Sequence, residues 1–467
     1  MAAISKRVNS IDIIRGIAII GMVLCANIGF NSDLPAWMFH AQTPPPTHAF
    51  NPDVPGITWV DLVFPFFLFS MGAAFPLAMK KKLDNGIRKR TVAAGLVKRW
   101  IILSIFAIVL GNAYGLYATT RPTWQADIFK IALWAAMMLA LINIPLKEGA
   151  TGWRRYLAPA VNLTGAVMTV MLGTIYVRWF GLTIDKGVCD VIIMILANLA
   201  LWGGLIWMLT RNSLRLRWSV ILFIAAVKAL SSYAPETLAW VPSPGPLSWL
   251  FSWAYLQYLV IALVGSVAGD LILAHSQSGE KPVISGKDTA AGIIALAAAL
   301  VQLWGLFVRE VTADLILSVI LCAAYFALTH KNRNICTDIA GIGFILLIAG
   351  IVFDPIDGGI TKDYCNLSYL FNTCGIAALT TSFLLTLELG HGVKGRFIAG
   401  VGQNPMLAYT VTNFLIGPIL GLLTLLPRLY ALAEGSQFWG VMQGVIITLL
   451  MAVVTYIFTR LRIFWKS

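Results

Sequence analysis

The residues best suited to proton transfer in this chain lie in one loop, residues 31–58, which carries His40 and His48 but no Lys or Arg. An imidazole takes up and releases a proton near neutral pH, so either ring is a candidate general base or nucleophile. Asp61 follows at the start of an apolar run, where a carboxylate can orient a histidine to accept a proton. Two plainer interpretations stay open. Either histidine fits an ordinary loop position, and Asp61 beside Thr58 fits an acid favoured at a helix N-terminus.

A second polar set interrupts the preceding apolar run. Asp12 and Arg15 are three residues apart and share a helix face. The two residues can simply pair with each other at the inner membrane edge. Alternatively, Arg15 holds a phosphate and Asp12 orients it. Asn27 lies farther along the same run, about 18 Å from Arg15 at ~1.5 Å per helical residue. Its amide can form a hydrogen bond to a neighbouring helix. Alternatively, it can polarise the carbonyl of a substrate.

Further candidates occur in the C-terminal half. Lys362 and Ser368 lie in a polar segment, residues 359–369, that leads into an apolar run. Asn404 directly precedes a proline at the start of another run and fits a helix N-cap. Lys228 lies in the middle of an apolar run, so it needs a partner within the protein.

The composition describes the elements that must position these side chains. The chain has 467 residues, of which 58% are hydrophobic and 12% charged, and its mean hydropathy is +0.80. A soluble domain carries about 25% charged residues. We therefore expect an all-α, polytopic transmembrane bundle of about 14 spans, in a range of about 11 to 14, and a single integral membrane domain over residues 1–467. The expected spans are residues 11–30, 59–79, 96–117, 127–144, 157–179, 188–209, 218–233, 250–273, 290–309, 313–328, 338–353, 369–388, 397–425 and 438–463.

The distribution of the 34 Lys and Arg residues predicts the orientation. With the N-terminus inside, most of them fall in inner segments, above all in residues 80–99, which predicts that both termini are cytoplasmic. The loop over residues 31–58 then faces the periplasm. The outer loops hold only Arg121, Arg178, Lys186, Arg309, Lys362 and Arg428. The formal charge of +13 is therefore assigned to cytoplasmic loops and to contact with anionic membrane lipid, and not to nucleic acid.

Several function classes are not supported by any motif. The chain has no Walker loop, no nucleophile elbow, no zinc-protease motif and no dinucleotide fingerprint. Its six cysteines show no metal-ligand spacing, so we expect packing cysteines and no metal. The first apolar run is not a signal peptide, because Asp12 and Arg15 interrupt it.

Two sequence blocks carry a resemblance to a known family. The first is Ser10-Ile-Asp-Ile-Ile-Arg-Gly16, and the second is Asp61-Leu-Val-Phe-Pro-Phe-Phe-Leu-Phe69 with the small residues that follow. Between them lie Asn27, a histidine and Gly56-Ile-Thr58. Together they resemble the transmembrane N-acetyltransferases of the heparan-alpha-glucosaminide N-acetyltransferase family. The chain looks like a bacterial, DUF5009-like relative in the inner membrane, because no large luminal domain precedes the first block.

The resemblance implies a reaction and a site. The family transfers an acetyl group from cytosolic acetyl-CoA to the amine of a terminal glucosamine on the far side of the membrane. Both histidines precede an alanine, as the family pattern requires, and we favour His48 over His40 because it lies nearer to Asp61 in sequence. The implied site comprises His48, His40, Asp61 and Asn27 for catalysis, Arg15, Asp12, Lys130 and Arg99 for acetyl-CoA, and Lys362, Ser368, Asn404 and Tyr409 for the acceptor.

Other interpretations remain open at this stage. The acetyl group can pass directly to the acceptor or through an acetyl-histidine. The acceptor is an amino sugar or a glycan, and O-acylation of a cell-envelope glycan is a close variant. A secondary transporter for a sugar or glycan fragment is the alternative from another class, although no internal repeat supports it. The sequence leaves open whether the protein is a monomer or a homodimer.

Overall fold

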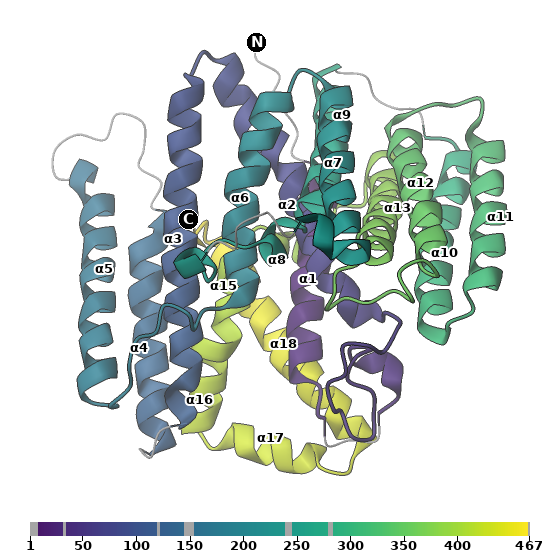
Figure 1. Cartoon of the computed structure of the whole chain (residues 1–467). Coiled ribbons are helices and arrows are strands. Elements are labelled where there is room, and N and C mark those ends of the chain that lie inside the picture. Colours follow the sequence, from purple (N-terminus) through teal and green to yellow (C-terminus); the bar gives the residue numbers. More distant parts are fainter. Residues whose placement is uncertain are drawn as a thin grey trace. The chain divides into compact units, whose positions relative to one another are not determined.

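The computed structural model describes residues 8–30, 34–118, 122–143, 154–238, 245–278 and 284–465 (Figure 1). Almost all of its regular structure is helical, as the composition predicts. In chain order the elements are α1 (Asn9–Asn27), η1 (Ala36–Met38), α2 (Trp59–Asp84), α3 (Lys89–Tyr114), η2 (Gly115–Ala118), α4 (Thr123–Leu141), β1 (Ile142–Asn143), α5 (Arg154–Arg178), α6 (Val191–Thr210), α7 (Leu214–Tyr233), η3 (Pro235–Leu238), η4 (Gly245–Leu247), α8 (Trp253–Leu256), α9 (Leu259–Ser278), α10 (Gly286–Val308), α11 (Val311–Thr329), α12 (Ile335–Phe353), α13 (Leu367–His391), α14 (Arg396–Gly402), α15 (Pro405–Val411), the π-helix η5 (Thr412–Ile416), α16 (Gly417–Leu422), α17 (Leu425–Ala433), α18 (Gln437–Arg460) and β2 (Phe464–Trp465).

Within the described residues, 13 helices are long and apolar enough to cross a membrane. This confirms an all-α, multi-pass membrane protein and lies within the expected range of spans. The span expected over residues 218–233 is helical, as part of α7, but is not among the 13. Its cations lower its hydropathy, and two of them are buried: Arg217 pairs with Asp270 of α9, and Lys228 donates to the carbonyl of Tyr364.

The chain folds into two compact units, each assembled from separate segments. The first unit comprises residues 1–18, 35–100 and 195–399, and the second comprises residues 19–34, 101–194 and 400–467. The expectation of a single membrane domain stays a prediction.

Two helices of the first unit, α2 and α9, pack against each other through small residues. A Cβ atom added at Gly72 would lie 1.8 Å from the carbonyl oxygen of Ala262, and one at Gly265 would lie 2.1 Å from that of Phe69. Gly269 follows Gly265 by four residues, and a Cβ there would also clash with backbone. This is the Gly-x-x-x-Gly spacing that lets membrane helices approach closely. The contact fixes the helix whose first turn carries Asp61.

The helix α13 contacts α2, α9, α10 and α12, and most of its residues are buried. Its C-terminal half carries Glu388, which accepts hydrogen bonds from the backbone amides of Asn9 (2.8 Å) and Ser10 (2.7 Å). An acid that receives the free amides of a helix N-terminus caps that helix. Glu388 therefore ties the start of α1 to α13, and the other end of α13 leads into the segment that carries Lys362.

In the second unit α5 packs on α4, and two strands of two residues each pair with one another. β1 and β2 pair antiparallel, with Ile142 opposite Trp465 and Asn143 opposite Phe464. The all-α prediction did not include this pair, which is too short to have a sequence signature. Asn404 holds it in place, because its amide donates to Ile463 O (2.8 Å) and accepts from Trp465 N (3.2 Å).

Candidate functional site

The site in the first unit is built on Asp61, at the third position of α2. Asp61 forms a capping box with Thr58: its Oδ2 atom accepts from Thr58 N (2.9 Å), while the Thr58 hydroxyl accepts from Val60 N. The residue is 1% exposed. A capping box satisfies two backbone donors of the first turn and fixes the side chain of its acid. The second carboxylate oxygen, Oδ1, is thereby aimed away from the helix.

That second oxygen contacts a histidine. His40 Nδ1 lies 2.6 Å from Asp61 Oδ1, and the His40 side chain is 36% exposed. A nitrogen this close to a buried carboxylate carries the hydrogen and donates it. The proton on Nδ1 leaves Nε2 as the basic nitrogen of the neutral ring, and Nε2 has no hydrogen-bond partner among the described residues. The cluster therefore presents an oriented, accessible proton acceptor.

Lys362 completes the cluster from the segment between α12 and α13. Its Nζ lies 3.1 Å from His40 Nδ1 and 3.7 Å from Asp61 Oδ1, and its side chain is 29% exposed. The ammonium offsets the negative charge of the buried Asp61, which would otherwise be costly. Because the side chain is partly exposed, a bound acceptor can reach it.

Backbone contacts fix the loop that carries His40. Thr58 Oγ1 donates to Phe39 O (2.7 Å), and Ala41 N lies 3.4 Å from Asp61 Oδ2. Tyr369, near the start of α13, donates its hydroxyl to the backbone carbonyl of Asp61 (2.9 Å). The residues on both sides of His40 are thus tied to the first turn of α2, which limits the positions open to the ring.

A second set of contacts fixes the segment that carries Lys362. Arg309 forms a bidentate ion pair with Asp354 (2.9 and 2.6 Å), and Asp354 also accepts from Ile360 N (2.7 Å). Lys228 donates to Tyr364 O (2.8 Å). These contacts hold the chain on both sides of Lys362. They identify the partner of Lys228, which the sequence did not show.

Two further ionisable groups lie in this segment. Burial raises the pKa of the Cys365 thiol to about 12, although nearby Lys228 opposes the shift, so Cys365 stays protonated and is not a nucleophile at neutral pH. Burial also raises the pKa of Asp357, against the hydrogen bonds it accepts from Tyr233 and from the amide of Ser368. Among the described residues, no group of three or more His, Cys, Asp or Glu could hold a metal ion.

The structure pairs Asp61 with His40, whereas the sequence favoured His48. Distance along the chain misled here, because the loop turns back on itself: His48 Nδ1 faces Thr43 O (3.3 Å), and its ring packs edge-on against Phe39 (4.5 Å between ring centres). His48 also has a positive φ of 50°, which is uncommon outside turns.

The four residues expected to bind the acceptor do not lie together in one site. Lys362 joins the cluster. Ser368 is 0% exposed and its hydroxyl donates to Gly350 O (2.9 Å). Asn404 precedes the first residue of α15, as expected for an N-cap, but its side chain does not cap and instead binds the last strand. Tyr409, also in the second unit, donates to Asp190 Oδ2 (2.8 Å).

The residues expected to bind acetyl-CoA divide between the units. In the first unit, Arg15 lies 3.6 Å from Asp12 and donates to Ser70 O (3.0 Å). Arg99 lies near enough to Arg15 for like-charge repulsion. Two arginines close together favour an anion between them. Lys130 belongs to the second unit, buried with its ammonium 3.8 Å from the ring centre of Tyr117. Asn27 lies in the second unit as well, where its amide donates to Val23 O (2.7 Å).

The positioning residues around the cluster were missed from sequence. Thr58 was noted only as the neighbour of Asp61 at an expected helix start, and neither Tyr369 nor the Arg309–Asp354 pair was singled out. A capping-box spacing, Thr58 to Asp61, was the one usable signal. The other partners lie about 45 or more residues apart in sequence, where no local pattern connects them.

These features define a multi-pass membrane protein with a buried carboxylate that orients a histidine beside a lysine. A family model described as a domain of unknown function, DUF5009, matches residues 7–272. The chain belongs to this family. The chain is also 34% identical over 113 residues to the human heparan-alpha-glucosaminide N-acetyltransferase; the match covers 24% of this chain and 15% of the human enzyme's length.

Proposed function

We propose that this protein is a transmembrane acetyltransferase of the bacterial inner membrane. It moves an acetyl group from cytosolic acetyl-CoA to the amine of an amino sugar, such as the terminal glucosamine of a glycan, on the periplasmic side. The observation that carries the proposal is His40, held by the buried Asp61 at 2.6 Å with Nε2 free. The similarity to the human enzyme supports the choice of reaction.

In the direct route the acceptor nitrogen attacks the thioester carbonyl carbon, so that a C–N bond forms and the C–S bond breaks. The amine proton passes to His40 Nε2, and the CoA thiolate takes up a proton as it leaves. Asp61 stabilises the imidazolium formed in between. General base catalysis of this kind contributes about 10²–10⁴-fold to the rate. In the alternative route His40 Nε2 carries the acetyl group before the amine receives it.

The lysine of the cluster suits the recognition of the acceptor. The Nζ atom of Lys362 is held by the ion pair with Asp61, yet part of the side chain is exposed. Its remaining N–H groups can donate to sugar hydroxyls, or to a carboxylate or sulfate on a glycan. Lys362 therefore acts as a substrate-binding residue, and it helps to hold Asp61 in its charged form.

The donor is proposed to enter from the cytoplasm near Arg15 and Arg99. Asp12, Arg15 and Asn27 all lie on α1. The helical rise therefore separates Arg15 from Asn27 by ~18 Å along that helix. This length is comparable with an extended pantetheine arm. CoA phosphates at the arginine pair would lose affinity as salt is raised.

The test is acetyl transfer in proteoliposomes in which the cytoplasmic face of the protein points outward. Radiolabelled acetyl-CoA is added outside, and glucosamine, the acceptor, is enclosed inside. We expect His40→Ala to lower kcat by about 10²–10⁴-fold. His48→Ala is the matched control, because it removes a histidine from the same loop without touching Asp61, and it should keep wild-type activity. Full activity in His40→Ala would exclude the cluster from catalysis.

Two further readouts separate the alternatives. Labelled protein that survives quenching in the absence of acceptor, and is lost in His40→Ala, would identify the acetyl-histidine route. Resistance of the product to mild alkaline hydrolysis distinguishes an amide from an ester, and hence N- from O-acetylation. Uptake of glucosamine with no acetylated product would identify a transporter and overturn the acetyltransferase proposal.

A further inference from the structure

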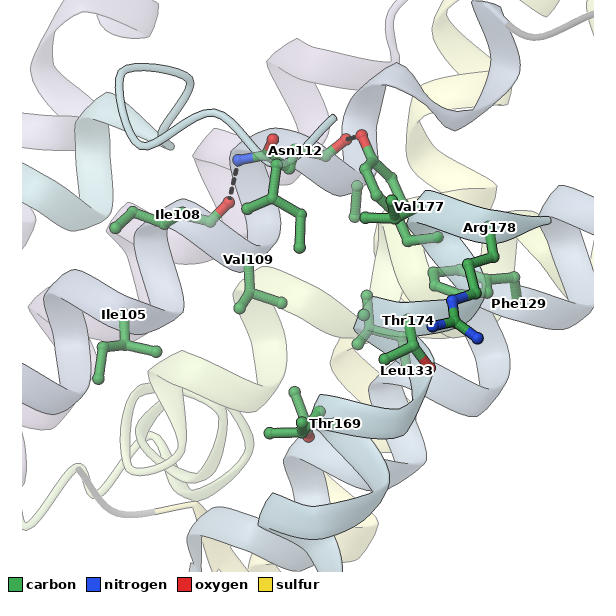
Figure 2. A pocket seen from close by; sticks show the side chains of 15 residues that line it. Ile105, Ile108, Val109, Asn112, Phe129, Leu133, Thr169, Thr174, Val177 and Arg178 are labelled. Carbon is green, nitrogen blue, oxygen red and sulfur yellow. Dashed lines mark hydrogen bonds between the residues drawn. The ribbon is translucent and has the colours of Figure 1, made fainter. Parts of the chain in front are cut away.

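A cavity of about 540 Å³ lies within the second unit, lined by residues of α3, α4 and α5 and of the turn after α5. Its volume falls in the range typical of small-molecule sites, about 300–1,000 Å³. Figure 2 shows the α3 side chains Ile105, Ile108 and Val109 on one side and Thr174 and Arg178 on the other. Most of the remaining lining is aliphatic or aromatic, so the cavity suits a hydrocarbon chain.

Two glycines of α5 explain why the cavity exists. A Cβ atom at Gly165 would lie 2.2 Å from the backbone nitrogen of Ala140, so α5 touches α4 at that point. Two turns later, a Cβ at Gly173 would meet only Ile184, at 3.8 Å. The space beside Gly173 is therefore open. Any side chain larger than that of alanine at position 173 would project into the cavity.

One end of the cavity is polar but internally satisfied. The Asn112 amide donates to the carbonyls of Ile108, Asp185 and Val188, each at 2.9 Å, and accepts from Asp185 N (2.9 Å). The Tyr176 hydroxyl donates to Asn112 O (2.8 Å). These groups close the cavity against the turn after α5, and they have little capacity left for a ligand.

The exception is Arg178, the one charged residue among the described residues that line the cavity. No acid lies within ion-pair distance of its guanidinium in the described part of the chain. The next residue, Trp179, is 53% exposed, and exposed tryptophans next to a span mark the membrane–water interface. The cavity is therefore amphipathic, with an apolar body and a cation at the level of lipid headgroups.

We infer that this cavity is a binding site for one acyl chain of an anionic phospholipid, whose phosphate pairs with Arg178. The guanidinium offers a planar, bidentate fork that matches a phosphate. The aliphatic and aromatic side chains that line the cavity can pack against the acyl chain and hold it at a fixed position. An uncharged or zwitterionic lipid would fill the same space without a net negative charge to pair with Arg178.

The test uses the full-length protein in nanodiscs that contain equal amounts of phosphatidylglycerol and phosphatidylcholine with identical acyl chains. Native mass spectrometry then identifies the lipid that stays bound when the protein is released from the nanodisc. We expect about one retained phosphatidylglycerol per chain, at roughly tenfold preference. Arg178→Gln should retain a lipid but lose the preference. Gly173→Phe should lose the retained lipid.

Met171→Phe is the matched control for the glycine variant, because Met171 is on the same helix, 60% exposed, and not among the lining residues. It should retain lipid as the wild type does. Gly173→Leu provides a second, smaller blocking variant, and size-exclusion chromatography checks that each variant is folded. Retention in both folded position-173 variants, or equal retention of the two lipids by the wild type, would overturn the inference.

Discussion

In the first unit a buried acid contacts a base, whereas in the second unit buried acids contact phenols. Asp61 is paired with His40, whose side chain is 36% exposed. In the second unit Asp127 accepts from the Tyr117 hydroxyl (2.5 Å), and Asp190 accepts from those of Tyr409 and Tyr114. A phenol keeps its proton at neutral pH. Of these two arrangements, only the first supplies a base that could accept a proton in the proposed acyl transfer.

The cations differ in the same way. Lys362 belongs to a loop segment and is 29% exposed, while Lys130 is 3% exposed and lies over the ring of Tyr117. A cation over an aromatic face is stabilised without solvent. The comparison teaches that charge within a membrane segment is not by itself a site. What identifies the site in the first unit is an accessible titratable group with a buried partner.

The largest effect expected from this comparison follows Asp61→Asn. The amide keeps a similar shape but no longer stabilises an imidazolium, so kcat should fall by about 10²–10⁴-fold. In a His40→Ala background the same change should cost little more, because the two residues act as one unit. Acetyl transfer by the single and double variants measures this. Independent, multiplicative losses would separate Asp61 from His40 in the mechanism.

Thr58→Ala is the matched control for that experiment. It removes the other half of the capping box, so folding stability should fall by about 1 kcal/mol. The variant also removes the hydroxyl that donates to Phe39 O beside His40. We therefore expect some loss of kcat per folded molecule, but far less than in Asp61→Asn, because the carboxylate that His40 contacts is still present. A loss equal to that of Asp61→Asn would mean that helix capping, and not proton transfer, explains the effect of position 61.

A smaller effect is expected for Lys362→Met, which removes the ammonium and keeps much of the side-chain length. If Lys362 binds the acceptor, the KM for the acceptor should rise by roughly tenfold, the equivalent of one charge-assisted hydrogen bond. The KM for acetyl-CoA should not change. Initial-rate measurements with each substrate varied in turn decide this. An effect on the acetyl-CoA KM alone would place Lys362 with the donor.

In the second unit Tyr409→Phe should affect stability and not chemistry. The variant removes a 2.8 Å hydrogen bond to Asp190, worth about 1 kcal/mol, so the thermal midpoint should fall while kcat and KM per folded molecule stay within about twofold. An unchanged midpoint with a raised acceptor KM would instead support the sequence-based expectation that Tyr409 binds substrate, and would break the contrast between the units.

How far the sequence predicted the molecule depended on the range of the contacts involved. Span positions follow from local hydropathy, so they were predicted well, and α7 differed because buried Arg217 and Lys228 reduce its apolar character. Asp61 was singled out from its place in a motif, and its catalytic role stays a prediction. The sequence did not show that His40, and not His48, lies beside Asp61, because this depends on how a proline-containing loop folds back; which histidine acts in catalysis stays a prediction. Lys362 is separated from His40 by 322 residues, so only the folded chain could join them.

The smallest expected effect concerns Asp357, which anchors the Lys362 segment to the start of α13 by accepting from Ser368 N (2.6 Å). Burial raises its pKa above the ordinary value of 3.8, so the folded protein holds this proton more tightly than the unfolded chain. The resulting stability is present below the unfolded pKa and is lost as the pH rises through the folded pKa.

Asp357→Asn mimics the protonated side chain at every pH. The difference in thermal midpoint between this variant and the wild type should therefore grow in the variant's favour as the pH is raised from about 4 towards neutrality. Thermal unfolding in detergent across that range measures it, and taking the difference cancels the titration of groups shared by both proteins. A difference that does not change with pH would show that Asp357 is charged in the folded protein over the whole range. In that case a charged acid would hold the Lys362 segment at Asp357, as Asp354, the partner of Arg309, holds it at Ile360.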